Sequence, residues 1–273
     1  MGGLTIDQDK CNQDGICAAV CPRCLIEMAP EEYPSAGPDF AELCLQCGHC
    51  VAVCPEAALS LDWLRPEDCL DLKPELSLDP EQAVQFLRSR RSIRAYQDRP
   101  VERAKLEELL ATAVHAASAS NGQPWHWLVI QDRGEVKRLT GLVIDWMHQT
   151  IDQDPDLAQA FSMASLVSAW DSGQDRISRD APHLILVHGD EGLFFGHEDG
   201  ALALSYVELL APALGLGACW VGYFSYPSNS YPPLTEALGL PKGHRFYGSM
   251  LVGYPQYKYH RSPVRNPPRV TWQ

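Results

Sequence analysis

Apolar side chains recur at helical spacing in several stretches of the chain. After Val101 they occupy one face of a predicted helix, at Leu106, Leu109, Leu110, Ala113 and Val114. The same periodicity predicts helical stretches near residues 135–149, 156–170 and 199–214.

Short runs of β-branched and aromatic residues lie between these helices and are typical of strands. They are WHWLVIQ at 125–131, HLILVHG at 183–189, ACWVGYF at 218–224 and FYGSMLVGY at 246–254. Helices and strands mixed in this way indicate an α/β or α+β fold. We expect the α+β class, with a central sheet flanked by helices.

Residues 63–80 carry prolines among acidic side chains and no sustained periodicity, as in an extended connector. The connector ends at a marked helix start, with Asp79 as N-cap, Pro80 at the first helical position and Gln82 placed to complete a capping box. We therefore divide the chain into an N-terminal domain (1–62), a linker (63–80) and a C-terminal domain (81–273).

The net charge of −13 is unevenly placed. Residues 1–80 hold 15 acidic and 4 basic side chains, whereas the rest hold 20 and 18. An acidic N-terminal lobe disfavours nucleic-acid binding and suits docking to a basic protein surface, although an acidic surface that only keeps the protein soluble fits equally well.

Prolines interrupt the longest uncharged stretch, residues 209–235, and the N-terminus lacks the basic and apolar regions of a signal peptide. We therefore expect a cytoplasmic protein that does not enter a membrane.

Eight of the ten cysteines lie between Cys11 and Cys54, which indicates metal chemistry rather than disulfides. The later ones form the run C-x2-C-x2-C-x3-C-P, made of Cys44, Cys47, Cys50, Cys54 and Pro55. In this bacterial ferredoxin run three thiolates hold one cubane and the fourth holds another.

An earlier copy of the run has one change. Cys11, Cys17 and Cys21 match its spacing, but Asp14 stands at the second thiolate position. Cys24 fits neither copy. We expect it to be a spare thiol or a replacement for Asp14 as a ligand.

Together the two runs resemble the two-cluster bacterial ferredoxins over residues 5–62. The resemblance implies crossed ligation of two [4Fe–4S] clusters, with Cys11, Cys17 and Cys54 holding one and Cys21, Cys44, Cys47 and Cys50 holding the other. The spacing makes Asp14 the candidate fourth ligand of the first cluster, for which [3Fe–4S] is the alternative. Zinc is the alternative, but zinc sites usually separate two C-x2-C pairs by a dozen or more residues, so the run favours iron–sulfur.

Two features of the C-terminal domain carry chemistry. Residues 90–94, RRSIR, bring three guanidinium groups and a hydroxyl to one place and could bind a phosphate. Taken alone, a basic run closing a helix is more often complementation of the helix dipole. Residues 118–125, SASNGQPW, offer Ser, Asn and Gln side chains that suit a flat heteroaromatic ring with several carbonyls.

In this order, and separated by one helix, the two features resemble the nitroreductase family of FMN flavoproteins. GLGACWVGYF (215–224) and YPQYKYHRSPVR (254–265) match further, so the resemblance covers about residues 81–273. It implies a homodimer with each FMN at the subunit interface.

Carried over residue by residue, the resemblance implies the following contacts. The FMN phosphate and ribityl end would meet Arg90, Arg91, Ser92 and Arg94. The ribityl chain and isoalloxazine ring would meet Ser118, Asn121 and Gln123. The backbone around Trp220, Val221 and Gly222 would approach the reactive edge of the flavin. Arg261 would close over the phosphate, with Arg265 as the rival candidate.

Two departures from the family bear on the substrate more than on the cofactor. Ala117 stands where the family often has proline, and Gly222 where some members have an acidic residue. Gly215-Leu216-Gly217 begins like a dinucleotide fingerprint, but it follows a helix and precedes a strand, the reverse of that motif. No dedicated NAD site is predicted.

We therefore expect an FMN-dependent oxidoreductase that passes electrons between two iron–sulfur clusters and an electron-poor organic acceptor, of nitroaromatic or quinone type. A flavin needs few acid–base residues from the protein, so no catalytic residue is assigned. A ferredoxin or NAD(P)H fits as donor. The alternatives are an electron-transfer flavoprotein whose acceptor is another protein, and a flavin domain with a zinc-bound interaction module.

Overall fold

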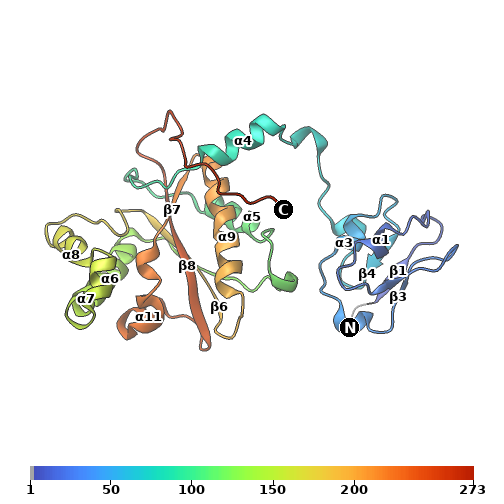
Figure 1. The fold of residues 1–273 in the computed structure, drawn as a ribbon, viewed down its shortest axis with the longest axis horizontal. Coiled ribbons are helices and arrows are strands. Elements are labelled where there is room, and N and C mark those ends of the chain that lie inside the picture. The colour runs from blue at the N-terminus through green and yellow to red at the C-terminus, as the bar shows by residue number, and fades with distance from the viewer. Residues whose placement is uncertain (1–2) are drawn as a thin grey trace. The chain divides into compact units, whose positions relative to one another are not determined.

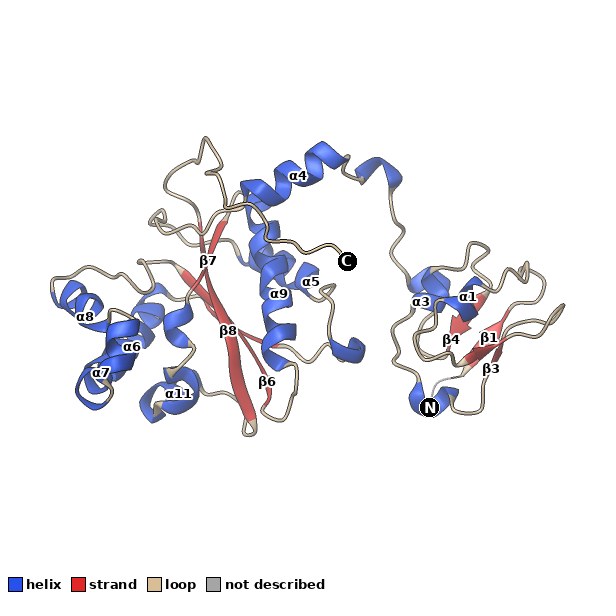
Figure 2. Ribbon diagram, viewed as in Figure 1, coloured by secondary structure: helices blue, strands red, loops and turns tan. Residues whose placement is uncertain are grey.

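The computed structural model describes residues 3–273, which form two compact units. The first unit extends to Ser77 and also includes Ser120–Gly122, and the second consists of Leu78–Ala119 and Gln123–Gln273. Figures 1 and 2 show the elements of each.

The first unit holds two small antiparallel pairs of strands and three one-turn helices. β1 (Leu4–Ile6) pairs with β4 (Leu59–Leu61), and β2 (Ile26–Glu27) pairs with β3 (Ser35–Ala36). The helices are α1 (Ile16–Ala19), α2 (Phe40–Leu43) and α3 (His49–Ala52). Their small core contains Cys17, Leu25, Ile26, Phe40, Val51, Leu59 and Leu61.

The connector contains two short 3-10 turns, Pro66–Asp68 and Pro74–Leu76. Leu70 and Leu72 between them are 80% and 95% exposed, so the connector has no core of its own.

The second unit is built on one antiparallel sheet of order β5-β6-β8-β7. Its strands are β5 (His126–Ile130), β6 (His183–Asp190), β7 (Gly217–Trp220) and β8 (His244–Gly253). Successive side chains of a strand point to opposite faces, and β6 shows this directly. Leu184 and Leu186 belong to one core, while Ile185 and Val187 belong to the other.

Helices cover both faces of this sheet. One face is packed by α6 (Arg133–Gln153), α7 (Pro155–Ala160), α8 (Met163–Asp171) and α11 (Pro232–Leu238). The other is packed by α5 (Arg103–Ala113) and α9 (Gly196–Leu210). Figure 2 shows the helices around the strands, which confirms the predicted α+β class. No helix within residues 3–273 is both long enough and apolar enough to cross a membrane.

The expected start of α4 (Pro80–Ser89) is confirmed. The carboxylate of Asp79 accepts a hydrogen bond from the Gln82 amide at 2.8 Å, and the Gln82 side chain accepts one from the Asp79 amide at 3.2 Å. These reciprocal bonds satisfy two amides that a helix N-terminus leaves unpaired.

Two predicted elements differ from the structure. The strand predicted over 218–224 ends at Trp220, because residues 222–224 form a 3-10 turn. The helix predicted over 156–170 is divided, because Ser162 adopts a left-handed conformation (φ 54°) between α7 and α8. Periodicity alone does not reveal such breaks, because the apolar spacing continues across them. The short helix α10 (Pro227–Ser230) was not predicted.

Candidate functional site

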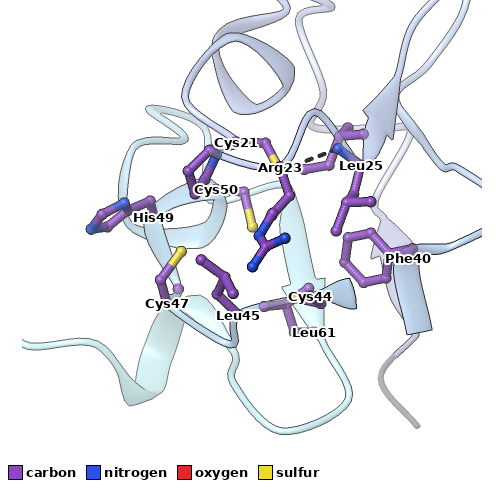
Figure 3. Close-up of a pocket in the computed structure, with 13 residues that line it drawn as sticks. Cys21, Arg23, Leu25, Phe40, Cys44, Leu45, Cys47, His49, Cys50 and Leu61 are labelled. Carbon is purple, nitrogen blue, oxygen red and sulfur yellow. Dashed lines mark hydrogen bonds between the residues drawn. The ribbon is translucent and has the colours of Figure 1, made fainter. Parts of the chain in front are cut away.

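Four cysteines of the first unit line one small cavity of about 20 Å³ (Figure 3). Cys21 comes from the first cysteine run, whereas Cys44, Cys47 and Cys50 come from the second. The rest of the lining is mostly apolar, with Leu25, Ile26, Phe40 and Leu61 among it, and it also includes Arg23 and His49. The fold thus brings together one of the two crossed sets named from the sequence.

The two cysteine runs have the same backbone conformation, 33 residues apart. Gly15 precedes α1 with φ 72°, and Gly48 precedes α3 with φ 71°. Glycine adopts this left-handed conformation without steric cost, and here it lets each loop turn directly into its helix.

The last cysteine of each run has the same hydrogen bond. The Leu25 amide donates to Cys21 Sγ at 3.3 Å, and the Ala58 amide donates to Cys54 Sγ at 3.3 Å. Amide donors aimed at a sulfur stabilise negative charge on it, so both sulfurs are suited to act as thiolates.

The members of the other set also lie near one another. Burial raises the pKa of the Cys17 thiol, and the charges of Cys54, Asp14 and Cys11 raise it further. Burial likewise raises the pKa of Cys50 to about 11 in the first cavity. Both thiols must therefore lose a proton when they bind a metal.

The Asp14 carboxylate lies at the start of α1. One of its carboxylate oxygens accepts a hydrogen bond from the Ile16 amide at 3.0 Å. Cys24 is exposed and has a positive φ of 51°, as does its counterpart Ala57 at 50°. Cys24 does not line the cavity of Figure 3.

In the second unit, the arginine segment after α4 runs beside β7. The Ile93 amide donates to the Ala218 carbonyl at 2.9 Å. A Cβ on Gly217 would stand 2.4 Å from Ile93 Cγ1, so only glycine allows this approach. Gly217, which belongs to the sequence that begins like a dinucleotide fingerprint, therefore allows residues 90–94 to pack against β7.

Arg90 is held by an ion pair. Its Nη1 lies 2.6 Å from Glu208 Oε1 on α9, and the Glu208 side chain is only 10% exposed. The Arg90 guanidinium is therefore held against α9, and the Glu208 carboxylate compensates its charge.

Arg91 lies in a different setting. It lines a cavity of about 230 Å³ together with Arg261 and Ser262. Its Nη2 donates to the Arg88 carbonyl at 2.7 Å and to the Ser262 hydroxyl. Its Nε is buried and has no hydrogen-bond partner among residues 3–273. Two guanidinium groups and an orphaned donor at one cavity suit an anion.

The loop 118–123 is folded by its own side chains and by α9. Ser118 Oγ accepts a hydrogen bond from the Gln123 amide at 3.0 Å, and Asp199 accepts one from the Ala119 amide at 2.9 Å. Asn121 and Gln123 have positive φ values of 55° and 43°. The loop is thus constrained before it enters β5.

Two buried acids on α9, Asp199 and Glu208, were not predicted from the sequence. One holds the loop and the other holds Arg90. Nine residues separate them, which is about 13.5 Å along a helix. The sequence did carry one indication of these roles, because Asp199 and Glu208 lie in a largely apolar helix. Carboxylates are rarely buried unless they are paired, so a partner for each could have been expected.

The remaining named residues lie on or beside the same elements. Trp220 ends β7 and is 38% exposed, and Val221 is buried. Apart from its chain neighbours, no described residue has an atom within 4 Å of the position of a Cβ on Gly222. Ser92 is half-buried and Arg94 is exposed. Arg265 is exposed and does not line the cavity shared by Arg91 and Arg261.

A sequence model described as the nitroreductase family matches residues 87–254, which is more than half of the chain. The chain belongs to the nitroreductase family. A second model, described as a 4Fe-4S binding domain, matches residues 4–23, the segment of the first cysteine run.

Relatives of this nitroreductase-family chain carry several names. An FMN reductase (NAD(P)H) of Bacillus subtilis is 26% identical over 67% of this chain and 69% of its own length. An NADH dehydrogenase of Thermus thermophilus is 29% identical over 64% of this chain and 89% of its own. A Bacteroides fragilis nitroreductase solved with bound FMN has the same fold, with a TM-score of 0.56, 20% identity and coverage of 70% of this chain and 99% of that one.

Proposed function

We propose that this chain is an FMN-dependent oxidoreductase in which two iron–sulfur clusters exchange electrons with the flavin, which reduces an electron-poor organic acceptor of nitroaromatic or quinone type. The observation that carries the proposal is the convergence of Cys21 with Cys44, Cys47 and Cys50 in a chain whose second unit is a nitroreductase.

The first unit supplies the ligands of both clusters in this proposal. Cys21, Cys44, Cys47 and Cys50 hold one cluster, and their cavity and the amide bonded to Cys21 Sγ support this. Cys11, Asp14, Cys17 and Cys54 hold the other, which their electrostatic proximity supports. Each cluster moves electrons singly.

The second unit binds FMN in this proposal. Arg91 and Arg261 grip the phosphate, and the unpaired Nε of Arg91 supports that assignment. Ser92 and Arg94 lie on the same segment, and Arg90 positions that segment through Glu208. Ser118, Asn121 and Gln123 bind the ribityl chain and ring, with Trp220, Val221 and Gly222 at the reactive edge.

Bound FMN accepts electrons singly or in pairs, so it can collect them from clusters and deliver two to an organic acceptor. The protein positions the cofactor and holds its charge, and no residue is assigned as a general acid or base. Bound phosphate would satisfy the buried Nε of Arg91, which water does not reach.

We also propose that the protein is a homodimer. Helix α4 has no buried residue, although its sequence carries an apolar face. Val84, Phe86 and Leu87 are 44%, 37% and 57% exposed. A second copy of the chain would cover such a face.

A protein acceptor is the second candidate, and the acidic first 80 residues favour it. The two candidates differ in turnover. Rapid electron exchange with a basic partner protein, together with negligible reduction of nitroaromatics and quinones, would select the protein acceptor.

Composition is the first test. Anaerobically purified protein should contain one FMN and about seven to eight irons per chain, as two clusters require. Stoichiometric zinc with little iron would rule out the clusters.

The electron path is the second test. A chain lacking residues 1–78 retains the Asp79 cap and the whole sheet. It should bind FMN and be reduced by dithionite, but it should lose rapid reduction by a ferredoxin-type donor. Unchanged reduction by that donor would show that the clusters are not on the path.

A further inference from the structure

Three histidines from neighbouring strands gather at one end of the sheet in the second unit. His126 begins β5, His188 lies near the end of β6, and His244 begins β8. Their ring centroids are 4.8 to 5.6 Å apart. The FMN assignment and the cysteine sites use none of the three.

Strand register explains why they meet. His126 lies directly opposite His188 in the β5–β6 pair. His244 lies opposite Asp190, two residues after His188 and therefore on the same face of the sheet. The register shifts between Val187 and His188, and such irregularities re-aim side chains at the end of a strand.

Two of the rings already stand at a distance that suits metal binding. His188 Nδ1 and His244 Nδ1 are 3.0 Å apart. One ion can lie about 2.0–2.1 Å from each nitrogen, the usual Zn–N bond length, between two atoms so placed. Imidazole is the commonest protein ligand for zinc, copper and nickel.

The third ring, that of His126, would have to change its side-chain rotamer to reach the same ion. In the conformation described for residues 3–273, no three His, Cys, Asp or Glu side chains converge on a single metal position. His126 is exposed and belongs to β5, an edge strand, so its ring is free to turn. His188, in contrast, is only 6% exposed and is fixed.

We propose that His126, His188 and His244 bind one divalent transition-metal ion of the zinc, nickel or cobalt type. Three histidines leave a coordination position for water or a further ligand. His244 also lines a surface cavity of about 540 Å³ together with Glu191, which gives an ion a path to the site. The bound ion would tie the edge strand β5 to β6 and β8.

The test is cobalt uptake by the complete protein with its clusters and flavin in place. Cobalt is chosen because the purified protein should contain none before dialysis, so all the cobalt measured afterwards has been taken up. All proteins carry Cys24→Ser, because that exposed thiol is itself a metal ligand. They are dialysed anaerobically against Co²⁺ and analysed for cobalt and iron.

The parent protein should take up one cobalt per chain, with iron unchanged. His126→Ala and His244→Ala should each weaken this uptake at least tenfold, whereas His148→Ala, which removes an exposed histidine on α6, should not. Co²⁺ should raise the unfolding temperature of the parent but not of His126→Ala. Equal uptake by the parent and His126→Ala would overturn the site and leave a hydrogen-bonded histidine cluster.

His126→Ala decides the matter even if His244→Ala fails to fold, because His126 is exposed at the edge of the sheet. Loss of cobalt in His244→Ala alone, with His126→Ala unaffected, would also contradict a three-histidine site.

Discussion

Arg90 and Glu208 form an ion pair, with Nη1 and Oε1 2.6 Å apart, between the segment after α4 and the helix α9. Because Glu208 is nearly buried, removing its partner leaves an uncompensated charge. Arg91, the next residue, has no such acid and lies at the cavity it shares with Arg261. The two neighbouring arginines therefore lie in different surroundings.

We predict that Arg90→Ala destabilises the protein more than Arg91→Ala does. Arg90 is about one-third exposed, so the expected loss in free energy of unfolding is about 1–3 kcal/mol, below that of a fully buried pair. Urea unfolding measures it. The double variant Arg90→Met/Glu208→Leu should recover part of the loss, and a double variant no more stable than Arg90→Ala would refute the pairing.

For FMN affinity we predict the opposite order, with Arg91→Ala having a larger effect than Arg90→Ala. Arg91→Ala should lower FMN affinity by about 10- to 150-fold, because a charge-assisted hydrogen bond is worth about 1.5–3 kcal/mol. Arg265→Ala is the matched control, since Arg265 lies outside the cavity. Fluorescence titration of FMN into the apoprotein measures both. Similar affinities for the two variants would place the phosphate elsewhere.

Gly217→Ala should loosen the arginine segment. The new Cβ would meet Ile93 Cγ1 at 2.4 Å, and overpacking of this kind costs about 1–3 kcal/mol. Gly222→Ala is the control for stability, because no atom lies within 4 Å of its Cβ position. The unfolding temperature should fall for Gly217→Ala only. Equal temperatures would mean that residues 90–94 do not pack on β7 as described.

The sequence predicted what depends on local pattern and spacing. The Asp79–Gln82 cap, the α+β class and the two cysteine runs all follow from residue types at fixed intervals. The roles of Asp199 and Glu208 did not follow, because each contacts a residue 80 or more positions away. The histidine cluster was missed for the same reason, since strand register determines it.

The histidine cluster makes stability depend on pH. Burial, followed by the charges of His244 and His126, lowers the pKa of His188 from 6.5 to about 4. Between these values the unfolded chain binds a proton at His188 that the folded chain does not bind. The free energy of unfolding therefore falls as the pH drops from 6.5 towards 4, by at most about 1.4 kcal/mol per pH unit from this group.

Replacing His188 should remove its contribution to the pH dependence of the free energy of unfolding. Urea unfolding at pH 7, 6 and 5, with a chelator present, should show a shallower decline for His188→Gln than for the parent protein. His148→Gln, on the exposed side of α6, should decline as the parent does. Acid lability of the proposed clusters would be common to all three proteins and would cancel in the comparison. Identical slopes for His188→Gln and the parent would show that His188 titrates normally.

Asp14 is the position where the first cysteine run departs from the second. A carboxylate holds iron more weakly than a thiolate does, so that corner of the cluster should be the labile one. The repeat places Asp14 where the second run has Cys47, and Cys24 where it has Ala57. Asp14 also accepts a hydrogen bond from the Ile16 amide, which fixes its carboxylate at the start of α1.

We therefore predict that mild oxidation converts only the cluster held by Cys11, Cys17 and Cys54 to a three-iron form. Asp14→Cys should block the conversion, because it restores a thiolate at the weak corner. Cys24→Ser should leave it unchanged, because the exposed Cys24 lies beyond Pro22, which ends the first cysteine run. Electron paramagnetic resonance of the oxidised parent and both variants shows the three-iron signal directly. If Cys24→Ser is instead the variant that loses the fourth iron, then Cys24 is the ligand and the alignment of the two runs fails at that corner.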